Sequence, residues 1–166
     1  MKTRAAIFAL LLCGALVPAV VAQKTKPELL GVRLGMAEAE ARARLNKVGR
    51  WEQEKEQRRD SVWELEGDRR FSHVAVGFDK ETRRVRYVTA FARAGGQRVQ
   101  PAEVLELKRA ERYTDPAMNY HYTERVRARR NRPGYVIIAV GKDPESLARL
   151  SVKIMQPAGG EEDDDK

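Results

Sequence analysis

A row of arginines is the part of this sequence whose residue types and spacing best fit a binding site. Arginine binds phosphate and carboxylate groups through paired hydrogen bonds. Residues 120–130 alternate in polarity, so the polar members would share one strand face, about 7 Å apart. That distance is close to the spacing of charges on a polyanion. The predicted anion-binding residues are His121, Arg125, Arg127, Arg129, Arg130 and Arg132.

The same arginine row has a plainer interpretation as a solvated sheet face or edge, kept charged to prevent aggregation. If the chain is exported, the available anions are phospholipid headgroups, lipopolysaccharide, acidic polymers and acidic proteins. Nucleic acid is not an expected partner, because Tyr120 and Tyr122 fall on the opposite, core-facing side and offer no stacking platform. We interpret Trp51 and Trp63 as core or interface anchors.

Residues that could act in catalysis are few. The chain has only two histidines, His73 and His121, and Ser72 beside the first lies in no nucleophile-elbow pattern. Neither histidine has further metal ligands at a characteristic spacing. Glu64 and Glu66 would share a strand face and could hold a cation, although a solvated pair is the ordinary interpretation. We therefore predict no enzymatic activity, no cofactor and no metal.

Short helices and strands would position these residues. Apolar periodicity indicates helices from about Ala37 to Leu45, ending at Asn46 as a left-handed cap, and from Pro101 to about Arg112. Gly49 to Asp60 is a loop or a second short helix. Strict alternation indicates half-buried antiparallel strands. These are residues 61–66, 72–78, 83–93 and 120–130, with a hairpin turn at 79–82. Residues 135–140 are apolar on both faces, which indicates a central strand, and Ala148, Leu150, Val152 and Ile154 form a last inward row.

The two halves of the chain match at an offset of 64 residues. Ala75-Val76-Gly77 matches Ala139-Val140-Gly141, and both halves follow the order helix, strand, strand, strand. Chance reuse of the same turn chemistry is the alternative to a repeat. The prediction is an α+β fold of two helix-plus-three-strand units, residues 31–94 and 95–156. Their strands would form one antiparallel sheet, or two abutting sheets, with helices packed on one face.

The N-terminus has the three parts of a signal peptide. Residues 1–22 contain two cations, an apolar run and the small residue Ala22 at the expected cleavage site. We therefore expect a periplasmic or extracellular protein. A permanent membrane helix is an alternative, weakened by a glycine and a proline within the run. A lipid anchor at Cys13 would require a small residue in place of Leu12, and without Cys13 the chain has no cysteine.

Charge is unevenly distributed along the chain, whose net charge is +8. Residues 157–166 are predicted to form a disordered tail that carries five acidic residues, and residues 23–30 an exposed lead-in. The tail either increases solubility or folds back and competes for the arginine row.

Leu34-Gly35-Met36, followed by helix to Leu45, resembles the small lipoprotein subunit of the outer-membrane β-barrel assembly machine and the related β-lactamase-inhibitor-protein-like domains. Ala41 takes the aliphatic position of that pattern. Ala37 and Asn46 depart from it, because they replace a capping hydroxyl residue and a glycine. The resemblance covers about a dozen residues. It implies helices on one face of an antiparallel sheet, tandem units in the inhibitor-like members, and docking on other proteins through the open sheet face.

The expected function is that of a non-enzymatic envelope or secreted protein that docks on another envelope or secreted protein. The alternative is a binder of phospholipid headgroups, lipopolysaccharide or acidic polymers through the arginine row. The sequence indicates no oligomeric state. No binding residue carries over from the resemblance, because the matched positions are structural.

Overall fold

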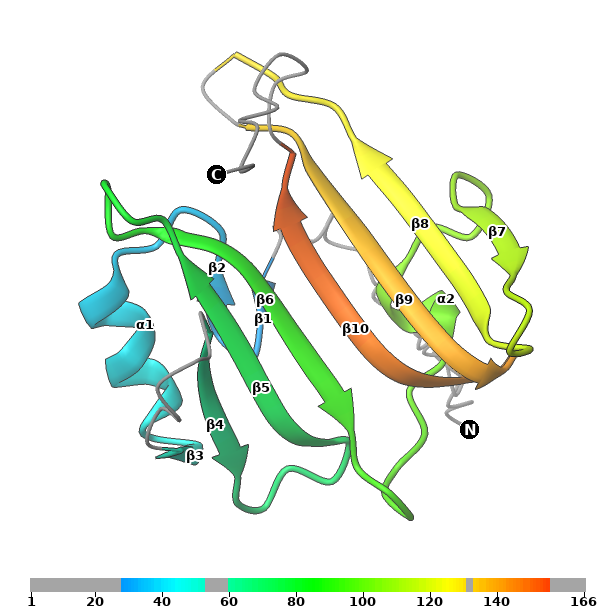
Figure 1. Ribbon diagram of the computed structural model, residues 1–166, viewed down its shortest axis with the longest axis horizontal. Helices are drawn as coiled ribbons and strands as arrows, with labels where there is room; N and C mark the ends of the chain where they lie inside the picture. The colour runs from blue at the N-terminus through cyan, green and yellow to red at the C-terminus, as the bar shows by residue number, and fades with distance from the viewer. Residues whose placement is uncertain (1–27, 53–59, 131–132, 156–166) are drawn as a thin grey trace, which may run out of the picture.

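One large antiparallel sheet dominates the structure (Figure 1). The computed structural model describes residues 28–52, 60–130 and 133–155. The sheet is built from β3 (Gly49–Glu52), β4 (Ser61–Leu65), β5 (Phe71–Phe78), β6 (Val85–Ala92), β7 (Glu111–Thr114), β8 (Tyr120–Val126), β9 (Tyr135–Asp143) and β10 (Ser146–Ile154). A separate hairpin, β1 (Glu28–Leu29) and β2 (Val32–Arg33), precedes α1 (Glu38–Leu45), and α2 (Pro101–Val104) lies between the halves.

The strand order is β3-β4-β5-β6-β10-β9-β8-β7. Each half of the chain is a four-stranded meander, and the last strands of the two halves, β6 and β10, pair at the centre. Val88 lies directly opposite Val152, and Thr89 opposite Ser151. This joint makes a single sheet, so side chains from both halves share each of its faces.

The predicted α+β class is wrong, because the described residues are mainly strand. Their helices are α1, with 8 residues, and α2, with 4. The predicted three-strand units are also wrong, since each half contributes four strands. The antiparallel pairing is confirmed in every strand pair of the sheet. A repeat in the sequence stays a prediction.

One face of the sheet carries the hydrophobic core. A row of paired core residues crosses the sheet from Trp63 through Val74, Ala90, Leu150 and Ala139 to Tyr122, and all of them are buried. Side chains that lie outside the sheet complete this core. They are Val32, Met36, Ala41, Leu45, Val99 and Leu105.

The other face is open. In Figure 1 the viewer looks onto it, and β1, β2 and α2 lie behind the sheet. Its residues alternate with the core residues along each strand, so they include Val62, Ala75 and Thr89 in one row. Val136, Ile138 and Val140 of β9 point to the same side and are half-buried.

Two connecting segments differ from the prediction. Gly49 to Asp60 was expected to be a loop or helix, but Gly49–Glu52 is the edge strand β3. Gly49 fits there because a Cβ would approach the Glu64 carbonyl oxygen to 2.4 Å. The helix predicted from Pro101 to Arg112 ends after one turn. Its continuation is prevented because the Glu106 N–H donates to the buried Glu124 carboxylate at 2.8 Å.

Two single-residue predictions also fail for local reasons. Asn46 ends α1 with a right-handed φ of −63°, so it is not a left-handed cap. Its side-chain oxygen instead accepts a hydrogen bond from the indole of the fully buried Trp63 at 2.8 Å. Ala148 is exposed because the β9–β10 register shifts between Leu147 and Arg149, and Leu147 takes its buried place.

The first helix and the 79–82 turn are confirmed. α1 begins one residue after Ala37 and ends at Leu45. In the turn, the Asp79 carboxylate accepts hydrogen bonds from the backbone N–H groups of Glu81 and Thr82. The predicted exposed lead-in is partly wrong, since Leu29 lies in β1 and packs against the core.

The predicted signal peptide and the acidic tail lie outside the described residues. None of the helices in the described part is long and apolar enough to span a membrane.

Candidate functional site

A hollow of about 870 Å³ lies on the open face of the first half of the sheet. Its floor is formed by the small or short side chains of Ala75 and Val62, which are neighbours on β5 and β4. The larger rings of His73, Tyr87 and Phe91 surround it. The hollow therefore exists because small residues at the centre of the face are flanked by aromatic ones.

Carboxylates line the hollow on its β3–β4 side. Glu52 lies 3.3 Å from the His73 ring nitrogen, and both side chains are about 40% exposed. Asp60 accepts a hydrogen bond from the Tyr87 hydroxyl. Burial, with this bond to Asp60, raises the pKa of Tyr87 above its usual range. The tyrosine consequently stays protonated and holds the Asp60 carboxylate at the edge of the hollow.

Tyr87 is fixed in place by its neighbours. A Cβ at Gly77, which lies directly opposite, would come within 2.2 Å of the ring, so the ring lies against the bare glycine backbone. The ammonium group of Lys153 stands 5.6 Å from the ring centroid on the β10 side. This contact shows that a cation is accommodated against the tyrosine ring.

Two small hydroxyl side chains at the centre of the open face are buried between their neighbours. Thr89 of β6 and Ser151 of β10 are 8% and 4% exposed, and their hydroxyls form a hydrogen bond of 2.9 Å. The pair joins the two halves of the chain across the central strand pair. It lies between the aromatic hollow and the more aliphatic surface of β9.

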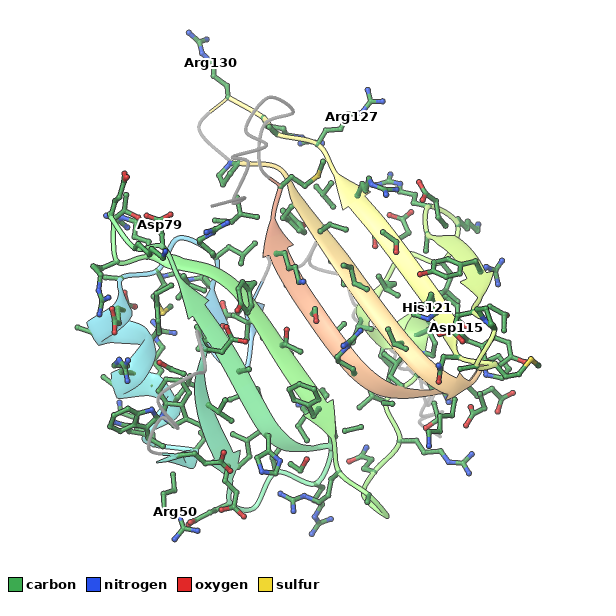
Figure 2. All side chains as sticks on the ribbon, in the orientation of Figure 1. Arg50, Asp79, Asp115, His121, Arg127 and Arg130 are labelled. Carbon is green, nitrogen blue, oxygen red and sulfur yellow. The ribbon has the colours of Figure 1, made fainter. Side chains whose placement is uncertain are left out.

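The second half of the face carries a polar cluster at the β7–β8 turn. The His121 ring stacks on Tyr113, with centroids 4.5 Å apart, and its Nε2 lies 2.8 Å from the Asp115 carboxylate. The hydrogen bond from His121, with others from Asn119, lowers the pKa of Asp115 to about 2. Figure 2 shows His121 and Asp115 together beside this turn. Asp115 and Asn119 also close the β7–β8 hairpin. The Asp115 N–H donates to the Asn119 carbonyl oxygen, and the Asn119 N–H donates to the Asp115 carboxylate.

The predicted arginine row is only partly continuous. His121 and Arg125 do share the open face, and Arg125 is paired with Glu111 of β7. β8 ends at Val126, so Arg127 and Arg129 do not continue that face. Arg127 and Arg130 project from the end of the sheet in Figure 2.

The last three described members of the arginine row are exposed and form no salt bridge with the described residues. These are Arg127, Arg129 and Arg130. Arg132, the remaining predicted member, lies outside the described residues. The structure therefore separates Arg125, which is already paired, from a group of available cations beyond the strand.

The other residues considered for chemistry have structural partners. The Ser72 hydroxyl faces the Phe91 carbonyl oxygen at 3.4 Å, whereas His73 faces Glu52, so the two do not form a dyad. Arg50 pairs with Glu64 at 2.9 Å and lies 3.9 Å from Glu66. The two carboxylates that could have held a cation therefore already share a cation of the chain itself. No group of three or more potential metal ligands occurs in the part of the chain that the structure describes.

Glu124 is a residue that the sequence analysis missed. It belongs to the inward row of Tyr122 and Val126, and the residue is 7% exposed. An acidic residue in an otherwise apolar inward row is a signal that could have identified it. Its contact with the Glu106 N–H fixes the segment after α2.

No protein-family model matches the chain. No curated protein and no solved structure matches it. The resemblance to the lipoprotein subunit and the inhibitor-like domains stays a prediction that rests on the residues quoted for it.

Proposed function

We propose that this chain is an exported, non-enzymatic protein that docks on a partner protein through the open face of its sheet. The observation that carries the proposal is the contrast between the two faces. One face is packed with buried side chains, whereas the other presents a hollow with aromatic walls beside half-buried aliphatic residues of β9. Aromatic anchors next to a recess are typical of the energetic centre of a protein interface.

The residues of this face also suit recognition better than catalysis. The described histidines are engaged with carboxylates, and the nearest serine to His73 faces a backbone carbonyl. Phe91 is 39% exposed although its ring is large and apolar. Burying the exposed part of this ring in a complex would contribute about 1 kcal/mol to binding.

Site-specific photo-cross-linking tests the docking face. A photoreactive amino acid is placed at Phe91 or Val140 on the open face, and at Ala43, which is exposed on α1, as the control. Each variant is made as residues 23–166, the mature chain expected after cleavage at Ala22, irradiated in an envelope extract and analysed by mass spectrometry. We expect Phe91 and Val140 to yield the same discrete cross-linked protein and Ala43 not to yield it. Equal products at all three positions would refute docking through this face.

A second candidate function is binding of anionic lipids or polymers, and the exposed cations beyond β8 favour it. Arg127, Arg129 and Arg130 carry three positive charges with no described ion-pair partner. Exposed cations near an anionic membrane surface contribute about 1 kcal/mol each. Replacing the three by serine should therefore weaken binding to anionic liposomes by about two orders of magnitude at low salt.

The control for the lipid experiment removes the same charge from arginines that already have partners. Arg50, Arg83 and Arg109 each pair with a glutamate. If this control triple variant loses liposome binding as strongly as the first, net charge explains the binding and the cations beyond β8 form no site.

A further inference from the structure

The described lining of the hollow on the open face is acidic, whereas the whole chain is basic. The net charge of the chain is +8, yet the charged residues among the described lining are Glu52 and Asp60. No lysine or arginine is among its described lining residues. A positive group on a partner would therefore complement the described charges of this recess.

The remaining lining residues suit the same kind of group. An exposed ring such as Phe91 attracts a cation over its face, and guanidinium groups also stack on aromatic rings. Within this chain, Arg42 shows the arrangement: its guanidinium lies between 5.2 and 5.7 Å from the rings of Trp51, Trp63 and Phe78. The hollow offers comparable components, rings and carboxylates, without such a cation from its described lining.

Positive charge begins on the other side of the hollow. Arg149 lies directly opposite Phe91, and Lys153 directly opposite Tyr87, both exposed on β10. From the acidic edge at Asp60, before β4, to β10 is three strand spacings, or about 14 Å. The open face is thus polarised, and this fixes the direction in which a charged partner segment can lie across it.

We propose that the hollow receives an arginine or lysine side chain of the docking partner, with its aliphatic stem against Val62 and Ala75 and its charge between Glu52 and Asp60. This inference rests on the proposed docking function and adds the chemistry of the partner. The partner segment would carry an acidic residue about 14 Å from its cation, to face Arg149 and Lys153.

A small cation tests the hollow without the partner. Acetyl-arginine methylamide is titrated into the mature chain while NMR signals of the methyl groups of Val62 and Ala75 and the ring of Phe91 are followed. The citrulline analogue, which has the same shape without the charge, is the matched probe. We expect the arginine probe to shift these signals and the citrulline probe to bind about tenfold more weakly, given one exposed cation–π contact and two exposed ion pairs.

Variants of the two carboxylates test whether Glu52 and Asp60 bind the arginine probe. Glu52→Gln and Asp60→Asn keep the shape of each side chain, and the amide oxygen at position 60 can still accept the Tyr87 hydroxyl. The double variant should weaken the arginine probe about fivefold. The control double variant, Glu81→Gln with Glu111→Gln, removes the same charge at exposed positions away from the hollow and should leave binding within twofold.

The outcomes separate this inference from the docking function itself. Equal binding of the two probes, no shifts, or an unchanged affinity in the Glu52/Asp60 double variant would each overturn the cation site. In the cross-linking experiment, the double variant should reduce the Phe91 product about fivefold. If that product persists at full yield, the docking function is retained and the cation site is refuted. If neither Phe91 nor Val140 yields a product when Glu52 and Asp60 are unchanged, the docking function is refuted whether or not the probe binds.

Discussion

The hydroxyl pair at the centre of the sheet gives a sharp test of how the two halves are joined. Thr89 and Ser151 lie on neighbouring strands from opposite halves of the chain, are buried, and bond to each other at 2.9 Å. Thr89→Val keeps the shape of the side chain but leaves the Ser151 hydroxyl without its partner. Ser151→Ala does the converse. A buried hydroxyl left unpaired costs about 1–3 kcal/mol, and each single variant should lose that much stability.

The double variant should be more stable than the two single variants predict. When both hydroxyls are replaced by apolar groups of similar shape, no polar group stays buried and unpaired, so the loss should be below about 1 kcal/mol. The coupling free energy between the two positions is then about 1–3 kcal/mol. For a chain of this length each 1 kcal/mol moves Tm by about 2–4 °C, so the single variants should differ measurably from the double.

Urea unfolding of the four proteins completes the double-mutant cycle. Thr123→Val is the matched control, because Thr123 lies on the same face but is half-exposed, and its hydroxyl can bond to water. We expect that variant to change the free energy of unfolding by less than about 0.5 kcal/mol. Additive effects at Thr89 and Ser151, with single variants no worse than Thr123→Val, would show that the hydroxyl pair does not link the halves.

Two further predictions concern single side chains. The Arg93 guanidinium donates to three backbone carbonyls around the β4–β5 connection, at 2.6–3.2 Å, so Arg93→Met should destabilise the fold by about 2–3 kcal/mol in urea unfolding, and Arg93→Lys should recover less than half. The pKa of Asp115 is lowered from 3.8 to about 2 by His121, so its stabilising effect is complete above pH 3.8 and is lost as the pH falls through 2. Hydrogen exchange of the β7–β8 hairpin should therefore accelerate over that range, and Asp115→Asn should remove the acceleration; an unchanged pH profile in the variant would contradict this origin.

The sequence was sufficient where local pattern decides structure. The apolar spacing in α1, the alternation in β5 and β6 and the apolar run of β9 concern residues that are close in the chain, and each predicted its element to within a few residues. The 79–82 turn was predictable for the same reason, since Asp79 bonds to the next residues along the chain.

The errors lie where a distant residue decides the local structure. The helix predicted after Pro101 has suitable apolar spacing, but Glu124 of a later strand takes the Glu106 N–H and the chain turns into β7. Asn46 looked like a helix cap, whereas its side chain is committed to Trp63 of β4. The short edge strands β3 and β7 are largely exposed and polar, so alternation could not reveal them, and missing them produced the wrong count of strands per unit.

The candidate site was the least predictable feature, because it depends on register across four strands. His73, Tyr87 and Glu52 come from three strands, and no spacing in the chain brings them together. The arginine row could be recognised from the residue types alone. The prediction that it shares one strand face is wrong beyond Val126, because the strand ends there and the side chains no longer alternate between two defined faces.

The two charged regions can act independently, because the structure places them on different parts of the molecule. The acidic hollow lies between β3 and β6, whereas Arg127, Arg129 and Arg130 follow the end of β8, which lies on the far side of the central β6–β10 pair. Screening limits charge interactions across such a distance, since exposed charges are felt over about 8 Å at physiological ionic strength. Loss of the three arginines should therefore leave arginine-probe binding in the hollow unchanged at that ionic strength. A chain that binds an anionic surface through β8 would thus still present the hollow to a basic partner segment.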